Sequence, residues 1–177
     1  MRALFLFSIL ALILCFSPAS VADDEPVWDG FKFDLENLQG DDVSETDVFA
    51  DGKLYLVDFW ASWCRPCSQY LPQLEKMVED YSDRGFEVVI FCVDEASTIS
   101  TARATLEGED YPFTILFDPE KAVQDELGAR RIPTTVLFDP EGNEVWRHVG
   151  YASGDEKDVR EKIEANLPEE AEADSGE

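Results

Sequence analysis

The sequence predicts an α/β fold in which helices flank a mixed β-sheet. Residues 54–60 form an apolar run of strand length, a helical pattern follows, and a second apolar run spans 86–93. This order is typical of two parallel strands joined by a crossover helix. Residues 134–138 and 144–149 enclose the tight turn 139–143 and predict an antiparallel pair. Both kinds of pairing are therefore expected in one sheet.

The chain before residue 54 predicts a β-hairpin. Trp28, Phe31, Phe33 and Leu35 alternate with charged residues at the two-residue period of a strand. Turn residues follow at 37–42 and again at 51–52. We therefore expect a short hairpin ahead of the main sheet.

The remaining elements follow from periodicity and from breaking residues. A helix is predicted from Pro66 to about Asp83, ending before Gly85, and the run 86–93 should be a central strand buried on both faces. Further helices are expected at 97–107, 121–127 and 155–167, with a short strand at 114–117 between the first two.

The length of 177 residues suits one domain, and its ends differ from the rest. Residues 1–22 have a positive start, an uncharged apolar run and small residues before Asp23, the pattern of a secretory signal peptide. Residues 23–167 should form the domain. Residues 168–177 carry five acids and no base, which favours a disordered acidic tail.

The N-terminal segment has two alternative interpretations. Its twenty uncharged residues could remain as a membrane anchor, and Cys15 could carry a lipid, although Leu14 is large where a lipidation motif needs a small residue. All three interpretations place the domain outside the cytoplasm, either periplasmic or secreted after cleavage near Ala22, or held at a membrane.

The chain is strongly acidic, with a formal net charge of −25. Nucleic acid and anionic membrane surfaces are therefore not expected as partners. The charge either keeps the surface solvated or steers a basic protein partner towards the molecule.

Two cysteines separated by two residues, Cys64 and Cys67, lie where strand 54–60 meets the predicted helix. A helix N-terminus has a partial positive charge that favours a thiolate, and Arg65 adds a full charge. Cys64 is therefore the predicted nucleophile at an exposed helix start, and Cys67 the resolving thiol. Cys92 should be an inert buried thiol, and His148 a surface residue.

The stretch Val57-Asp58-Phe59-Trp60-Ala61-Ser62-Trp63-Cys64-Arg65-Pro66-Cys67, with Arg131-Ile132-Pro133-Thr134-Thr135 downstream, resembles the thioredoxin superfamily, and in particular its TlpA/ResA-like extracytoplasmic branch. The resemblance covers roughly residues 27–166. It implies a thioredoxin fold with an N-terminal hairpin extension and a central insert.

The resemblance also assigns roles to individual residues. Pro133 matches the cis-proline whose loop, with Ile132, pairs with substrate, and Trp63, Arg65 and Pro66 should border the same site. Asp58 matches the thioredoxin acid that accepts the proton of the resolving cysteine, where many TlpA/ResA-like proteins carry Asn. Glu95 matches an acid that tunes the cysteine pKa values. Asp58 and Glu95 are therefore candidate catalytic residues beside Cys64 and Cys67.

The function implied is thiol–disulfide exchange outside the cytoplasm, with no cofactor beyond the Cys64–Cys67 disulfide. The thiols should reduce disulfides in exported proteins, for example in cytochrome c maturation, with electrons resupplied by a membrane donor protein. We expect a monomer. The alternative is a module that binds copper or zinc through Cys64 and Cys67 for delivery, which is short of ligands because the chain has one His and two Met.

Overall fold

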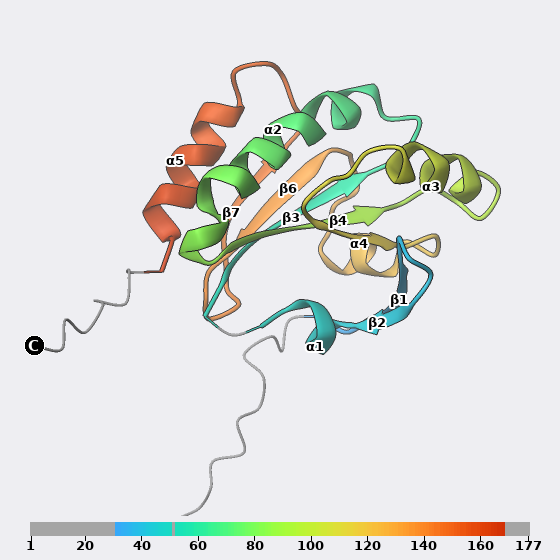
Figure 1. Ribbon diagram of the computed structural model, residues 1–177, viewed down its shortest axis with the longest axis horizontal. Coiled ribbons are helices and arrows are strands. Elements are labelled where there is room, and N and C mark those ends of the chain that lie inside the picture. Colours follow the sequence, from blue (N-terminus) through green and yellow to red (C-terminus); the bar gives the residue numbers. More distant parts are fainter. Residues whose placement is uncertain (1–30, 51, 169–177) are drawn as a thin grey trace, which may run out of the picture.

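The computed structural model describes residues 31–50 and 52–168 of the chain. Seven strands form one mixed sheet in the order β2-β1-β5-β4-β3-β6-β7, and helices flank it (Figure 1). The strands are β1 (Asp34–Asn37), β2 (Asp42–Ser44), β3 (Leu54–Trp60), β4 (Phe86–Cys92), β5 (Thr114–Phe117), β6 (Thr134–Phe138) and β7 (Glu144–Val149). The helices are α1 (Glu45–Val48), α2 (Arg65–Tyr81), α3 (Ile99–Glu107), α4 (Ala122–Glu126) and α5 (Glu156–Asn166), with a 3₁₀ turn at Ser82–Arg84.

The predicted α/β fold is confirmed, and from residue 54 onward the element boundaries agree to within two or three residues. Before residue 54 the agreement is poorer, because β1 begins only at Asp34 rather than in the alternating stretch that starts at Trp28, and the short helix α1 was not predicted. The signal peptide predicted for residues 1–22 and residues 169–177 of the predicted tail lie outside the described residues. Within the described part, no helix combines the length and the apolar character needed to cross a membrane.

Strand β3 is the central element of the sheet. It pairs in parallel with β4, from Leu54 opposite Phe86 to Trp60 opposite Cys92, and antiparallel with β6 on its other side. All seven of its residues are buried, because hydrogen-bonded neighbours cover both edges and packed layers cover both faces. The apolar composition of this run is what such a position requires.

Helix α2 connects β3 to β4 and packs an apolar stripe against the sheet. Its buried residues include Leu71, Leu74 and Met77, which recur at helical spacing. The chain then turns at Gly85, which has a φ of 79°, a left-handed conformation that glycine adopts without steric cost. Helix α5 lies beside α2, where Arg160 donates a hydrogen bond to Asp80 at 2.6 Å (Figure 1).

The predicted N-terminal hairpin is present as β1 and β2. Asn37 and Asp41 close its turn, with the Asp41 N–H donating to Asn37 Oδ1 at 2.9 Å. Strand β1 then pairs antiparallel with β5 and extends the main sheet. Ahead of the hairpin, Phe33 is buried with its ring centroid 5.6 Å from that of Phe91 on β4. The extension is therefore part of the core rather than an appendage.

Arg103 on α3 fastens this hairpin to the domain. Its guanidinium lies 4.3 Å from the centroid of the Phe117 ring and donates to the Leu38 carbonyl at 2.6 Å. It also forms an ion pair with Glu36 on β1. One side chain thus joins α3, β5 and the hairpin.

We expect Arg103→Gln to lower the free energy of unfolding by about 1–3 kcal/mol, because a cation–π contact and a charged hydrogen bond to a carbonyl are lost together. Equilibrium urea unfolding measures this loss. The matched control is Arg84→Gln, which breaks an exposed ion pair with Glu164 and should cost less than about 1 kcal/mol. Equal losses in the two variants would show that Arg103 does not anchor the hairpin.

Candidate active site

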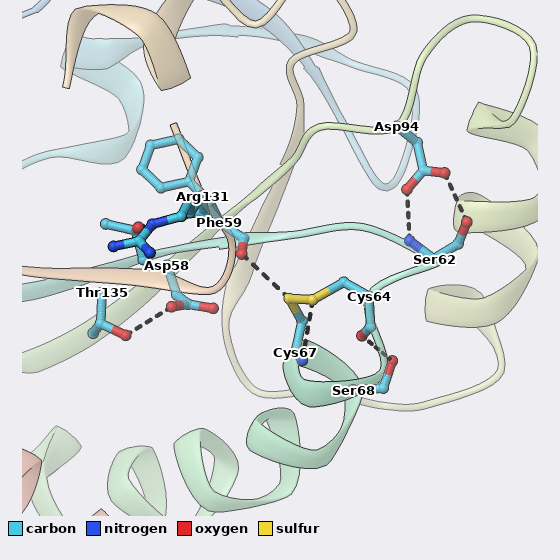
Figure 2. Close-up of a disulfide and its surroundings, with 10 residues drawn as sticks. Asp58, Phe59, Ser62, Cys64, Cys67, Ser68, Asp94, Arg131 and Thr135 are labelled. Carbon is cyan, nitrogen blue, oxygen red and sulfur yellow. Dashed lines mark hydrogen bonds between the residues drawn. A yellow bond between two sulfur atoms is a disulfide. The ribbon is translucent and has the colours of Figure 1, made fainter. Parts of the chain in front are cut away.

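The cysteine pair lies at the junction of β3 and α2, as a disulfide between Cys64 and Cys67 (Figure 2). Cys64 is the N-cap residue of α2, and its sulfur accepts the Cys67 N–H at 3.3 Å. Pro66 occupies the first turn of the helix, where its missing N–H costs nothing. The Cys64 sulfur therefore faces the N–H groups of the first helical turn, which have no partner within the helix.

The predicted exposure of Cys64 is wrong for this oxidised state. Cys64 is only 5% exposed and Cys67 is fully buried, and both belong to the hydrophobic core. Trp63 is 64% exposed, and Arg65 and Pro66 are exposed as well. Cys64 is still the more accessible of the two cysteines, as its predicted role as the attacking thiol requires.

The electrostatic setting of Cys64 favours a thiolate once the disulfide is reduced. The first turn of α2 contains no acidic residue, so the partial positive charge of the helix N-terminus is not neutralised there. Arg65 places a cationic side chain in the same turn. Both effects lower the energy of negative charge on the Cys64 sulfur.

Asp58 is buried on β3, six residues before Cys64, and is fully inaccessible to solvent. Its Oδ1 accepts a hydrogen bond from Thr135 Oγ1 at 2.8 Å, across the antiparallel β3–β6 pair. Its Oδ2 has no hydrogen-bond partner among the described residues. Burial raises the pKa of Asp58 from 3.8 to about 8, and the Thr135 hydrogen bond offsets this only in part.

The position of Asp58 relative to the cysteines follows from its neighbours. Figure 2 shows the Asp58 carboxyl group between Thr135 and the disulfide. The next residue, Phe59, places its carbonyl oxygen 3.8 Å from Cys67 Sγ. On reduction, the Cys67 thiol can donate a hydrogen bond to that carbonyl. Asp58 is therefore one residue along β3 from a direct contact of the resolving cysteine.

Tyr70 is a buried residue that the sequence interpretation missed. It lies one helical turn beyond Cys67, and its hydroxyl group has no hydrogen-bond partner among the described residues. Burial raises its pKa above the ordinary value for tyrosine, and the negative charge of Asp58 raises it further. Its ring stacks on that of Tyr151, with centroids 4.6 Å apart. The helical spacing from Cys67 was the available signal, whereas Thr135 could be linked to Asp58 only through the sheet register.

The acid at the end of β4 that faces the site is Asp94, which the sequence interpretation also missed. Asp94 is fully buried and accepts the Ser62 N–H and the Ser62 Oγ–H, both at 2.7 Å (Figure 2). The Cys92 thiol donates to the same carboxylate at 3.6 Å. These bonds hold the loop that precedes Cys64 against the neighbouring strand.

Glu95, selected from the sequence, has an exposed side chain that pairs with Lys121 at 3.1 Å. Its predicted influence on the cysteine pKa values stays a prediction. The two adjacent acids differ in burial, since Asp94 is fully buried whereas Glu95 is exposed.

The loop before β6 completes the site. The Ile132–Pro133 peptide bond is cis, and the Pro133 carbonyl accepts the Gly150 N–H at 2.8 Å. Thr134 Oγ1 donates to the Arg131 carbonyl at 2.5 Å. A groove of about 600 Å³ lies between this loop and Trp63, and Ile132 and Arg131 line it. The site therefore combines a disulfide, a buried acid and a surface groove.

Cys92 and His148 lie as predicted. Cys92 is a free and fully buried thiol, and burial raises its pKa to about 12. His148 is partly exposed on β7, 3.4 Å from Asp155. Within residues 31–50 and 52–168, no three His, Cys, Asp or Glu side chains gather as a potential metal site.

Comparison of the chain with known proteins identifies its family. The AhpC/TSA family profile matches residues 29–146. The chain belongs to the AhpC/TSA family. It is 32% identical over 132 residues to the thioredoxin-like protein YneN of Bacillus subtilis, a match that covers 75% of each chain. It is 30% identical over 138 residues to the thiol-disulfide oxidoreductase ResA of Halalkalibacterium halodurans, covering 78% of this chain and 75% of that protein.

A solved structure supports the same assignment for this AhpC/TSA member. A protein from Chlorobium tepidum, described as a thiol:disulfide interchange protein DsbE, superposes with a TM-score of 0.69 at 31% sequence identity. The match covers 78% of this chain and 94% of that one. The predicted thioredoxin-like fold, the resemblance to ResA-like proteins and the thiol–disulfide oxidoreductase class are therefore confirmed.

Asp58 should make the stability of this AhpC/TSA protein depend on pH. Its pKa is about 8 when folded and near the ordinary 3.8 when unfolded, so between these values the unfolded chain releases a proton that the folded chain retains. The stability of the folded state therefore falls as the pH rises. The contribution of Asp58 is fully present below about pH 4, decreases steadily above it and is lost as the pH rises through about 8.

We therefore expect Asp58→Asn to be more stable than the native protein by several kcal/mol at pH 8 and similar to it at pH 4, because the amide cannot ionise. The size of this stability difference follows from the folded and unfolded pKa values of Asp58, since each pKa unit corresponds to about 1.4 kcal/mol. Urea unfolding of the oxidised proteins at both pH values gives the comparison. A difference between the two proteins that does not change with pH would show that Asp58 is not held protonated by burial.

Proposed function

We propose that the chain is a protein-disulfide reductase that acts outside the cytoplasm, and that its Cys64–Cys67 dithiol reduces disulfides of exported proteins, for example in cytochrome c maturation. The observation that carries this proposal is the disulfide at the start of α2, beside a cis-proline loop and a surface groove. The relatives named ResA and DsbE support the assignment of thiol–disulfide exchange. No cofactor beyond the dithiol is required by this chemistry.

The first step is attack by Cys64. Its thiolate, favoured by the helix N-terminus and Arg65, attacks one sulfur of the substrate disulfide. A Cys64–substrate disulfide forms, and the other substrate sulfur leaves as a thiolate and takes a proton from solvent. Because Cys64 is only 5% exposed, this attack requires a substrate disulfide that fits closely against the start of α2.

The second step is resolution by Cys67. Its thiol is buried and must lose a proton before it can attack Cys64 Sγ. The ionised form of Asp58 accepts that proton, and its raised pKa of about 8 makes it a stronger base than an ordinary carboxylate. The Cys64–Cys67 disulfide forms, and the substrate leaves with both sulfurs reduced.

The substrate chain is positioned by the loop at Ile132–Pro133. Its backbone lies beside the groove, where an extended segment can pair with it as an added strand. Trp63, which is 64% exposed, lines the same groove. These contacts would hold the substrate disulfide in line with Cys64.

The direction of electron flow is proposed to be reductive. Arg65 and Pro66 separate the two cysteines. Strong oxidants have a histidine between their cysteines, and this chain does not. A reductant in an oxidising compartment must be re-reduced after each turnover. We therefore propose that its partners include a membrane electron donor. The enzyme itself would be a monomer that meets both donor and substrate at the same disulfide.

Three cysteine variants test the assignment of roles. We expect Cys64→Ala to abolish reduction of a disulfide substrate such as insulin, and Cys67→Ala to accumulate the Cys64–substrate disulfide because the second step is lost. Cys92→Ala is the control and should retain nearly full activity, since its thiol is fully buried. An insulin reduction assay with mass spectrometry of trapped adducts measures all three. Retained activity in Cys64→Ala would contradict the proposal.

The role of Asp58 as proton acceptor predicts a pH dependence of the second step. In the native enzyme, the rate of resolution should rise as the pH increases towards 8, where Asp58 becomes ionised. Asp58→Asn should slow resolution by about a hundredfold at pH 8 and remove this rise, because general-base catalysis is lost.

Single-turnover kinetics with acid quenching measures the decay of the mixed disulfide across the pH range. Glu95→Gln neutralises an exposed acid and is measured alongside; a rate and a pH profile like those of the native protein would show that Glu95 does not influence the second step. A parallel pH profile in Asp58→Asn, only displaced in rate, would indicate that Asp58 acts through structure alone.

A further inference from the structure

The arginines of this acidic chain fall into two groups. The described residues include seven arginines, and four of them form ion pairs with Asp or Glu away from the disulfide. Arg65, Arg130 and Arg131 have no carboxylate partner within salt-bridge distance among the described residues, although the chain contains 39 acids. Arg65 lies between the two cysteines, and the other two line the groove beside the disulfide.

The groove is lined by both apolar and cationic side chains. Trp63 and Ile132 supply apolar surface next to Cys64 and the cis-proline, respectively. Lys121, Arg130 and Arg131 supply positive charge, and Asp125 is the one acid among the lining residues. Lys121 is already paired with Glu95 at 3.1 Å. The charge available to a ligand therefore comes from the two adjacent arginines.

The backbone that presents these arginines is held in place. The Arg130 N–H donates to the Gly128 carbonyl at 2.9 Å, and the Arg131 carbonyl accepts from Thr134 Oγ1 at 2.5 Å. Gln124 Nε2 donates to the Ala129 carbonyl at 2.9 Å and fixes the preceding residue. These hydrogen bonds fix the backbone from which Arg130 and Arg131 project. Both arginine side chains are exposed to solvent.

An unpaired guanidinium beside a groove is suited to bind a carboxylate, because its fork of N–H donors matches two carboxylate oxygens. The net charge of −25 acts in the opposite sense at long range and repels an acidic ligand. Salt screens charges beyond about 8–10 Å, so contact charges in the groove act more strongly than the distant surface once a ligand is bound.

We propose that this groove binds a segment of the substrate polypeptide that carries Asp or Glu a few residues from its disulfide. This inference rests on the proposed function and specifies its substrate class. Arg130 and Arg131 bind the acidic side chains, while Trp63 and Ile132 contact an apolar residue of the same segment. The preference is opposite to the one expected from the charge of the whole molecule, which would favour a basic partner.

The test uses three synthetic peptides that contain the same disulfide and differ only in flanking residues, which are acidic, neutral or basic. The full-length protein is reduced and freed of reductant, and the rate of peptide reduction is followed in a single turnover. We expect the acidic peptide to react about threefold to tenfold faster than the neutral one at an ionic strength of about 0.15 M, where the distant surface charge is screened but one or two contact charge pairs still act. This ratio should approach one in concentrated salt.

Two double variants separate the groove from the overall charge. Arg130→Gln with Arg131→Gln should bring the ratio of acidic to neutral rates close to one. Lys76→Gln with Lys162→Gln changes the net charge equally at two lysines of α2 and α5 and should keep the ratio of the native protein. Equal ratios in both double variants would overturn the role of the arginines.

The remaining outcomes also decide the matter. A basic peptide that reacts fastest would show that the overall field, not the groove, selects substrates. Equal rates for all three peptides would refute the inference while leaving the disulfide reductase function intact. If none of the peptides is reduced, the proposed function fails and this inference fails with it.

Discussion

The pairing of β3 with β6 is the constraint on which the site depends. The two strands run antiparallel with Asp58 opposite Thr135, so the end of β3 lies beside the start of β6. The residues that follow β3 lead to Cys64, and the residues that precede β6 are Ile132 and Pro133. One register therefore brings together a disulfide and a cis-proline loop that lie far apart in the sequence. A slip of one residue would also turn Asp58 to the opposite face of the sheet.

Two buried carboxyl groups, one on β3 and one just after β4, serve the site differently because their partners differ. Asp94 accepts hydrogen bonds from the Ser62 N–H, the Ser62 hydroxyl and the Cys92 thiol, so both of its oxygens are occupied. Its carboxylate acts as a structural clamp on the loop before Cys64. Asp58 accepts from Thr135 at one oxygen, its other oxygen has no partner among the described residues, and burial keeps its pKa near 8. An acid with such an oxygen and a pKa close to that of a thiol has the capacity to exchange a proton.

Most of the fold could be predicted from the sequence, whereas the fine structure of the site could not. The strand at 54–60, the helix after it and the hairpin at 134–149 follow from local periodicity and turn residues, which depend on short stretches of chain. The exposure of Cys64 was misjudged because burial at a helix start depends on the packing of the whole core, which the local sequence does not show. The role of the buried Asp94 was missed because its hydrogen bonds to Ser62, more than thirty residues away in the sequence, exist only in the folded chain. Thr135 and Tyr70 required the register and the helix packing.

The charges of this protein act differently at long range and at contact distance. At distances beyond the screening length, the molecule acts through its net charge of −25, and salt removes most of that influence. Within the groove, Arg130 and Arg131 act at contact distance, where a guanidinium fork and a carboxylate fit each other. On a surface crowded with acids, most arginines are expected to find a carboxylate, and four of those in the described part of the chain do so. Because the two groove arginines have no such partner among the described residues, the groove keeps a positive charge that the acidic surface around it lacks.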